Sequence, residues 1–287
     1  TGQIDKLSAT QVKSLSTAQV AALTTAQATK LTTEQLASLN TSQVVAFSSL
    51  QIKALSEMQI AALTTAQIEK IPTSQLNVLS SVQVAALRSD QVEALTTEQV
   101  TALTSSQIRA LGTAQILAIQ TQDAAVMTQT QLASLSAAQM AALSTQQVFA
   151  LTTAQVRSLS AEQLNSLSTQ AWRVLETADI KALTTTQLQG LSTSQVAALT
   201  DAQITAINTA QVGALSSSSI KVLNTAQIQL LSTAQAGALN SIQLGSMNTA
   251  QIVALNTDQV AALKASELKG LKSSQLQILS TDKLSLW

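Results

Sequence analysis

The chain repeats one pattern of apolar and polar positions every eight residues. Beginning at Ile4, every eighth residue is apolar in all 36 cases; beginning at Leu7 the same holds, and 29 of those 36 are Leu. The residue before the first apolar position is Gln in 30 of 36 octads, and no insertion or deletion breaks the phase. Repetition at a fixed short period is typical of repeat architectures, so the repeated element decides the fold.

The residue that follows each recurrent Leu is of the type that begins a helix. Positions divisible by eight, from Ser8 to Ser280, are Ser, Thr or Asn in 28 of 35 cases. Such side chains accept a hydrogen bond from an unpaired N–H of the first helical turn. With this residue as the N-cap, the Gln is the third helical residue and completes a capping box, and the two apolar residues form a hydrophobic staple. The pattern predicts one helix of about six residues in every octad.

The charged residues support this register independently. Of 15 acidic residues, 11 lie at the first three helical positions, and of 15 basic residues, 11 lie in the last two positions before the Leu. The helix dipole favours this arrangement by about 0.3–1 kcal/mol for each charge. The charges therefore also predict a helix start and a helix end in each octad.

Two other architectures compete with this one. A continuous α-helix turns by about 100° per residue, so the apolar stripe would rotate by about 80° from one octad to the next. A β-solenoid is the stronger alternative, because Val, Ile and Thr favour strands. Against it, Ala, Leu and Gln favour helix, and seven Gly are few for β-solenoid corners. We expect an all-α, elongated solenoid of very short capped helices, forming one continuous array over residues 1–287.

An isolated octad is not expected to fold, because helix nucleation makes even peptides of about 12 residues marginal. Stability has to come from the stacking of successive coils. A longer period is visible at the small residue before the Leu, which is Val only at positions 48 residues apart: Val78, Val126, Val174 and Val222. Either the number of helices in a coil divides six, or a block of six octads was the unit of duplication.

Composition excludes several functions. Charged residues make up 10% of the chain and the formal net charge is zero, so no strong field attracts nucleic acid or an anionic membrane. The chain has no Cys and no His, and hence no disulfide, thiolate or imidazole chemistry. Its apolar runs are shorter than the ~20 residues of a membrane span. We expect no catalytic residues, no cofactor, no metal, no nucleic-acid partner and no membrane insertion.

A few side chains are candidates for a site, and each also has a structural interpretation. Asp123, Asp179 and Glu176 have the chemistry of a cation site. An acid at the third helical position, however, is expected to complete a capping box as well as Gln does. Trp172 and Trp287 occupy apolar positions of the octad, which predicts that they fill the core.

Other candidates lie at positions predicted to face solvent. Phe149 is at the variable position of its octad, and four lysines make the C-terminal end mildly basic: Lys264, Lys269, Lys272 and Lys283. The position after the N-cap is Ser or Thr in 29 of 36 octads. Small hydroxyl residues suit the first turn of a helix, and a regular array of them is also similar to the faces of solenoid ice-binding proteins.

The octads resemble the LTxxQ(V/I)xAL arrays of very large bacterial secreted or surface proteins, as LTTEQVTAL at 95–103 and LSTSQVAAL at 191–199 illustrate. The resemblance covers the whole chain and implies a long extracellular repeat region without catalytic residues. LTTEQVTAL also looks like the first helix of the TAL-effector DNA-binding repeat. That likeness ends after one helix, so it does not imply DNA reading.

Two functions are expected from these observations. The first is a non-catalytic spacer or stalk of a bacterial extracellular or surface protein, and the second is a repetitive platform that binds ice, a polysaccharide or a protein. The variable position changes among Lys, Ala, Glu, Thr, Arg, Gln and Gly, which favours the spacer. The chain starts part-way through an octad at Thr1, which indicates a piece of a longer protein. Apolar end faces predict association end to end or with flanking repeats.

Overall fold

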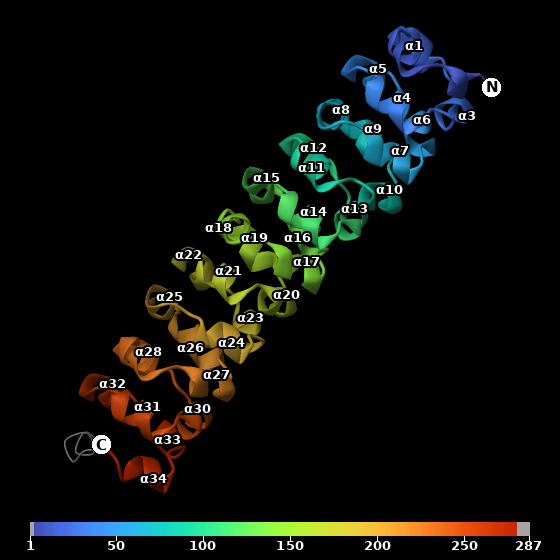
Figure 1. Ribbon diagram of the computed structural model, residues 1–287. Helices are drawn as coiled ribbons and strands as arrows, with labels where there is room; N and C mark the ends of the chain where they lie inside the picture. The colour runs from blue at the N-terminus through green and yellow to red at the C-terminus, as the bar shows by residue number, and fades with distance from the viewer. Residues whose placement is uncertain (1–2, 280–287) are drawn as a thin grey trace. The chain divides into compact units, whose positions relative to one another are not determined.

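The structure is a computed structural model that describes residues 3–279. Within this range it contains 34 α-helices and one short 3-10 helix, and no residue lies in a β-strand. Each α-helix has four to six residues and occupies one octad (Figure 1). The predicted all-α solenoid with one short helix per octad is confirmed, and the β-solenoid is ruled out for the described range.

The chain forms two compact units, Thr1–Leu143 and Ser144–Trp287. The first unit contains η1 (Ile4–Lys6), α1 (Ala9–Lys13), α2 (Thr17–Ala21), α3 (Thr25–Ala28), α4 (Thr33–Ser38), α5 (Thr41–Val45), α6 (Ser49–Ala54), α7 (Glu57–Ala62), α8 (Thr65–Lys70), α9 (Thr73–Leu76), α10 (Ser81–Ala85), α11 (Ser89–Glu93), α12 (Thr97–Ala102), α13 (Ser105–Ala110), α14 (Thr113–Ala118), α15 (Thr121–Val126), α16 (Gln129–Ala133) and α17 (Ala137–Ala142). The second unit contains α18 (Thr145–Phe149), α19 (Thr153–Ser158), α20 (Ala161–Ser166), α21 (Thr169–Arg173), α22 (Thr177–Ala182), α23 (Thr185–Gln189), α24 (Thr193–Ala197), α25 (Asp201–Ala206), α26 (Thr209–Ala214), α27 (Ser217–Val222), α28 (Thr225–Leu230), α29 (Thr233–Ala236), α30 (Ser241–Ser246), α31 (Thr249–Ala254), α32 (Thr257–Ala261), α33 (Ala265–Leu268) and α34 (Ser273–Leu276). The octad register of the sequence runs through both, and one continuous array over residues 1–287 stays a prediction.

The helices start where the sequence predicts. The N-cap of α1, Ser8, has extended backbone, and its side chain accepts a hydrogen bond from the N–H of Gln11. In return, the N–H of Ser8 donates to Oε1 of Gln11 at 2.8 Å. Asn caps form the same box, as in α32, where the N–H of Asn256 lies 2.8 Å from Oε1 of Gln259. One such cap stabilises a helix by about 1 kcal/mol, which is too little to fold an octad alone.

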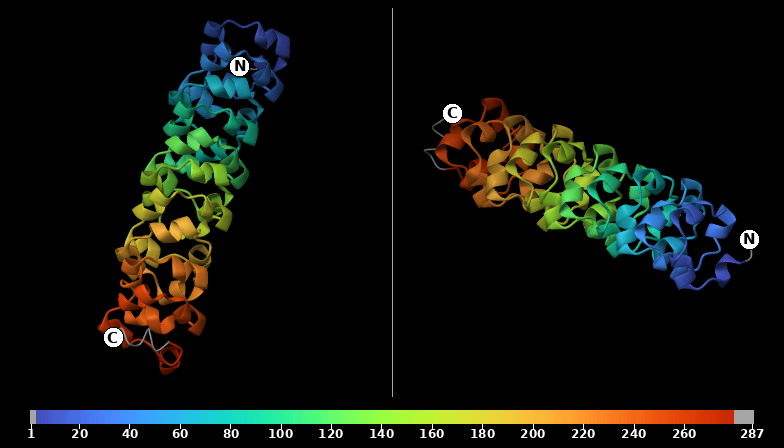
Figure 2. Two further views of the ribbon diagram at one scale, coloured as in Figure 1. Left: turned by 90° about the vertical axis from the view of Figure 1, so that its left-hand side faces the viewer. Right: turned by 90° about the horizontal axis from the view of Figure 1, so that it is seen from above.

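Three octads form one coil. Within each unit, helices pack against the helix three places away along the chain, as α4 does with α1 and with α7. Figures 1 and 2 show the short helices of each unit following one another in successive coils. Every third octad within a unit therefore lies in the same column. Because three divides six, the 48-residue period of the sequence spans two coils.

The core is aliphatic and comes from two positions of each octad. From Ala28 to Leu263, the fourth helical residue and the residue before the next N-cap are both buried, as Ile60 and Leu63 are in and after α7. Burying two such side chains stabilises an octad by about 3–6 kcal/mol. Full burial requires a neighbouring coil on each side, so stability is shared between coils, as in other solenoids.

Candidate functional site

The recurrent Gln is the most constant polar side chain, and it lies at the corner where one helix ends and the next begins. In α8, Oε1 of Gln67 accepts the N–H of the N-cap Thr64 at 2.7 Å. Its Nε2 donates to the carbonyls of Leu36 at 2.9 Å and Leu39 at 2.7 Å, in the preceding coil. These carbonyls belong to the last turn of α4 and the residue after it, so one amide satisfies unpaired groups at a helix start and a helix end.

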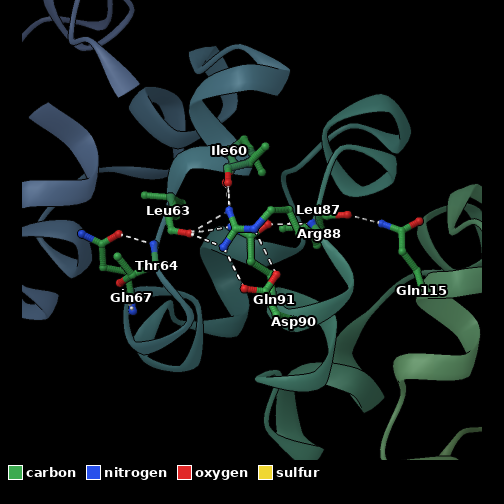
Figure 3. A network of polar contacts seen from close by, with 10 residues as sticks. Ile60, Leu63, Thr64, Gln67, Leu87, Arg88, Asp90, Gln91 and Gln115 are labelled. Atoms are coloured by element: carbon green, nitrogen blue, oxygen red, sulfur yellow. Dashed lines mark hydrogen bonds and ion pairs between the residues drawn. The ribbon is translucent and has the colours of Figure 1, made fainter. Parts of the chain in front are cut away.

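We call this paired contact a corner clamp, and it recurs along the column. Figure 3 shows both halves of it at Gln91, the capping half at Gln67 and the contact with the preceding coil at Gln115, and each of these Gln residues lies three octads from the next. Nε2 of Gln91 is 2.7 Å from the carbonyl oxygen of Leu63, and Nε2 of Gln115 is 2.6 Å from that of Leu87. The clamps tie each coil to the one before it through backbone groups, so the contact does not depend on which outward side chains an octad carries.

The sequence predicted only half of the corner clamp. A capping box accounts for Oε1, but it does not account for burial, and Gln91 has 0% of its surface exposed. A Glu would complete a capping box equally well. The third helical position is nevertheless Gln in 30 of 36 octads and Glu only at Glu267. This preference for an amide over a carboxylate is the signal that a second, donating contact exists.

Arg88 replaces the hydroxyl N-cap of α11 and forms a different tie to the preceding coil. Its guanidinium donates to the carbonyl oxygen of Ala61, and one of its nitrogens lies 3.5 Å from that of Leu63 (Figure 3). It also donates to Asp90 at 3.0 Å, and this hydrogen bond lowers the pKa of Asp90. A long basic side chain thus reaches the same carbonyls that the corner clamp uses.

Within each unit, the corner clamp is altered at alternate coils of one column. The octads that depart most from the repeat contain α9 and α15 in the first unit and α21, α27 and α33 in the second, each two coils from the next within its unit. In the last four, the third helical residue has no amide donor: Asp123, Ala171, Ser219 and Glu267. The 48-residue period of the sequence is therefore a period of altered clamps.

Pro72 removes one contact from the clamp of α9. Proline has no N–H, so Oε1 of Gln75 lacks its usual donor and is buried without a hydrogen-bond partner. Nε2 of Gln75 keeps its acceptors, including the carbonyl of Val45 at 3.0 Å. A buried acceptor without a partner costs about 1–3 kcal/mol.

We therefore predict that Pro72→Ser raises the free energy of unfolding of the first unit. The gain is about 1 kcal/mol, because the restored N–H and hydroxyl outweigh the greater freedom of the unfolded chain without proline. Urea unfolding followed by circular dichroism measures it. Pro72→Ala restores the N–H alone and should give a smaller gain; a loss of stability in both variants would contradict the prediction.

The acidic candidates accept hydrogen bonds from hydroxyl and N–H groups of the chain. Asp179 accepts the N–H of Glu176 at 3.0 Å and the hydroxyl of Thr153 at 2.8 Å. Asp123 forms no capping box in α15, and it accepts the hydroxyl of Thr97 from the preceding coil at 2.7 Å. The expectation that an acid at this position completes the box as well as Gln therefore holds for Asp179 and is wrong for Asp123, which accepts the hydroxyl of Thr97 but not the N–H of its N-cap, Gln120. Within residues 3–279, no three His, Cys, Asp or Glu side chains are grouped to hold a metal ion.

Burial raises the pKa of Asp123, although its hydrogen bond from Thr97 opposes the shift. A raised pKa means that the folded state binds the proton more tightly than the unfolded state. This contribution to stability is present below the ordinary pKa of Asp and is lost as pH rises through the raised value. Asn does not ionise, so Asp123→Asn should avoid the loss of stability at neutral pH. We expect it to raise the free energy of unfolding at pH 7 by about 1 kcal/mol.

The measurement is urea unfolding of both proteins across the acidic range. The matched control is Glu98→Gln, which neutralises an exposed acid of the same unit. The difference between Asp123→Asn and the unaltered protein should grow as pH rises through the acidic range, and at pH 7 this variant should be more stable than the control. A difference that is independent of pH would show that Asp123 does not titrate as proposed.

The aromatic candidates have no common location. Trp172 is buried in the core, as predicted, and its Nε1 has no hydrogen-bond partner within the described residues. Ala171 stands beside it at the position of the clamp Gln. Phe149 is outward, with 57% of its surface exposed. Trp287 lies outside the described residues, so its predicted place in the core is not tested.

Two shallow hollows lie between stacked helices. One, of about 320 Å³, lies between α13 and α16 and is lined by Arg109 with Ser, Thr and Ala. The other, of about 450 Å³, lies between α30 and α33 beside Lys269. Lys264 and Lys272 are exposed N-caps of α33 and α34, and Lys283 lies outside the described range.

The hydroxyl residues that follow the N-caps fall into columns, because each coil has three helices. In each unit, one column has Ser or Thr in five successive coils; its members are Thr25, Ser49, Thr73, Thr97 and Thr121 in the first unit and Thr145, Thr169, Thr193, Ser217 and Ser241 in the second. At eight of these ten positions the N-cap side chain one residue earlier already makes the hydrogen bond that starts the helix, and the exceptions are Pro72 and Gln120. Capping therefore does not explain this column.

Within residues 3–279, no helix is long and apolar enough to cross a membrane.

Comparison with known proteins identifies the repeat. The family profile described as "ALTTAQ repeat" matches six segments that together cover more than half of the chain: residues 1–33, 30–65, 68–105, 173–209, 204–241 and 237–265. No curated protein matches the chain. Among solved structures, a leucine-rich repeat-containing protein, LegL7 from Legionella pneumophila, matches with 12% identity and a TM-score of 0.22, covering 93% of this chain and 86% of its own. That score does not establish a common fold.

The matched segments consist of the octads described above. The words of the family name occur unchanged at residues 22–27, 62–67 and 150–155, where they join the end of one helix to the N-cap and first turn of the next. Between residues 106 and 172 the profile has no match, yet the helices continue with the same length and N-cap position. The chain belongs to the ALTTAQ repeat family.

Proposed function

We propose that this tandem-repeat chain is a non-catalytic spacer or stalk of a bacterial extracellular or surface protein. The observation that supports it is the use of the recurrent polar side chains. The N-cap hydroxyls accept hydrogen bonds from N–H groups of the first helical turn. The Gln side chains are buried in contacts between coils, as Gln67 is. The polar residues that recur in the sequence therefore serve to form the helices and to hold the coils together.

The outward position supports the same proposal. It is occupied by Lys53, Asn77, Thr101 and Ala125 in consecutive coils of one column, and these side chains share no chemistry. A surface that recognises one repeated ligand would keep one residue type at the contact position. A spacer needs only a soluble exterior, which varied small and polar side chains provide.

The proposal is tested on intact cells that produce the parent protein. In one variant, the outward residues are exchanged among octads; in the other, whole coils of three octads are deleted. Antibody access to a tag on the far side of the array should survive the exchange and fall with each deletion. Equal access in both variants, or a tag found only inside the cell, would overturn the spacer function.

A repetitive binding platform is the second candidate, and the hydroxyl columns Thr25–Thr121 in the first unit and Thr145–Ser241 in the second favour it. Its ligand would be ice, a polysaccharide or a protein. Thermal hysteresis and a glycan array test the first two ligands directly. Replacing the column by Ala should abolish a positive signal, whereas replacing hydroxyls of a second column, such as Thr33 and Thr177, is the control.

A further inference from the structure

We infer that the second unit opens locally at one place in its stack, where α27 and α28 meet the coil that precedes them. At most corners, a Gln side chain accepts the N–H of its N-cap and donates to carbonyls of the preceding coil. In α26 this corner clamp is complete, because Nε2 of Gln211 lies 2.9 Å from the carbonyl oxygen of Ile180 and 2.8 Å from that of Leu183. Its Oε1 accepts the N–H of the N-cap Asn208 at 2.8 Å. The next two corners along the chain are incomplete.

The corner at α27 lacks both halves of the clamp, because Ser219 replaces the Gln. Ser219 is fully buried, and its hydroxyl lies 2.8 Å from Oγ of its own N-cap, Ser216. No side chain at the third helical position accepts the N–H of Ser216, so this helix has no capping box. The carbonyl 28 residues back, which a clamp would use, is that of Leu191, and it accepts no hydrogen bond from the described residues. The two backbone groups that one Gln joins at other corners are therefore not joined at this one.

The neighbouring corner, at α28, has a weaker contact with the preceding coil. Nε2 of Gln227 donates to the carbonyl of Leu199 at 2.9 Å, and it makes no second hydrogen bond to the described part of that coil. In α30, Gln243 again reaches two carbonyls, those of Val212 at 2.9 Å and Leu215 at 2.7 Å. The two incomplete corners thus lie next to each other along the chain, and complete clamps precede and follow them.

The apolar core keeps α27 in place but does not replace the missing clamp. Ile220 and Leu223 are buried as their equivalents are in other octads, and α27 packs against both α24 and α30. The hydrogen bonds between coils are therefore what distinguishes this corner. A solenoid is held together by contacts between neighbouring coils, and local opening begins where a fold is least stable. The inference goes beyond the spacer function and does not depend on it, because it concerns the stability of the second unit alone.

Amide hydrogen exchange of the full chain, corrected for intrinsic rates, tests this inference. The amides of α27 and of the last turn of α23 should exchange about 5- to 30-fold faster than those of α26, which keeps its clamp. Ser219→Gln supplies the missing amide and should slow exchange in α27 by a similar factor. The matched control is Ser218→Gln, which adds the same side chain at an exposed neighbour and should leave exchange in α27 unchanged.

The reciprocal variant, Gln211→Ser, gives α26 the side chain that α27 has, and it should raise exchange in α26 to the level of α27. It decides the question even if Gln is too large for the corner at α27. Three results would each overturn the inference: equal exchange in α26 and α27 of the unaltered chain, a Gln211→Ser chain whose α26 stays protected, or a folded Ser219→Gln chain whose α27 exchanges as fast as before. Because the assay contains no cell and no parent protein, these outcomes are independent of the spacer function.

Discussion

Gln67→Glu should lower the free energy of unfolding of the first unit by about 3–5 kcal/mol at pH 7. This is the largest effect that we expect from a single substitution that keeps the size of the side chain. Glu keeps the oxygen that accepts the N–H of Thr64, so the capping box survives. The carboxylate loses both donors, and it is buried against the carbonyl oxygens of Leu36 and Leu39, which lie 2.9 and 2.7 Å from Nε2 in the unaltered protein. An unpaired buried charge facing two acceptors is costly.

The matched control is Gln27→Glu, because Thr24–Gln27 and Thr64–Gln67 have the same sequence, TTAQ. Gln27 forms the box with Thr24 at 2.8 Å but has no Nε2 acceptor within residues 3–279. Its replacement should change stability by less than about 0.5 kcal/mol, as surface changes usually do. Urea unfolding and amide hydrogen exchange of α4 and α8 measure the difference.

The effect at position 67 should shrink at acidic pH, since a protonated carboxyl has one O–H to donate. A solenoid transmits damage mainly to neighbouring coils. Amide hydrogen exchange should therefore accelerate first in α8 and in the coil that precedes it. Equal losses in the two variants would show that the box, rather than the contact between coils, is what Gln provides.

The helix in each octad could be predicted because its determinants are local. The Ser8 cap, the Gln11 box and the staple between Leu7 and Val12 all lie within a single repeat length, and the charges report the same helix ends. Stacking could also be predicted, since an octad cannot fold alone. These inferences need no knowledge of which coil meets which.

The number of helices in a coil could not be predicted in the same way. Every octad presents nearly the same residues, so contacts between octads three places apart leave almost no pattern of their own in the sequence. Only the departures at 48-residue intervals record the column, and they are consistent with any divisor of six. The structure resolves this because α4 packs on α1 and α7.

The corner clamp was missed because its second half is a contact between residues of successive coils. Gln67 meets Leu39, which is 28 residues away, and the octad alone assigns Gln67 a complete role as a box residue. The same reasoning assigned Asp123 to a box that it does not form. A local explanation that satisfies one atom of a side chain gives no information about its other atoms.

Gly270→Ala should destabilise the second unit by about 1–3 kcal/mol, because the turn after α33 approaches the first residue of α30 through the backbone at this position. A Cβ at Gly270 would overlap the carbonyl oxygen of Ser241 and lie 2.5 Å from its carbonyl carbon. No described Gly has a positive φ, so the need for Gly here comes from the close approach and not from backbone conformation. Backbone atoms cannot rotate away, and α33 would have to move from α30.

Gly213→Ala in α26 is the matched control in the same unit, and it should act in the opposite direction. A Cβ there meets only the carbonyl oxygen of Ala238 at 3.5 Å, an ordinary contact. Ala in a helix interior is more favourable than Gly by about 0.5–1 kcal/mol. Urea unfolding should therefore separate two identical substitutions by about 2–4 kcal/mol. If both variants gain stability, α30 and α33 are not packed backbone to backbone, and the stack at this end is looser than the coils before it.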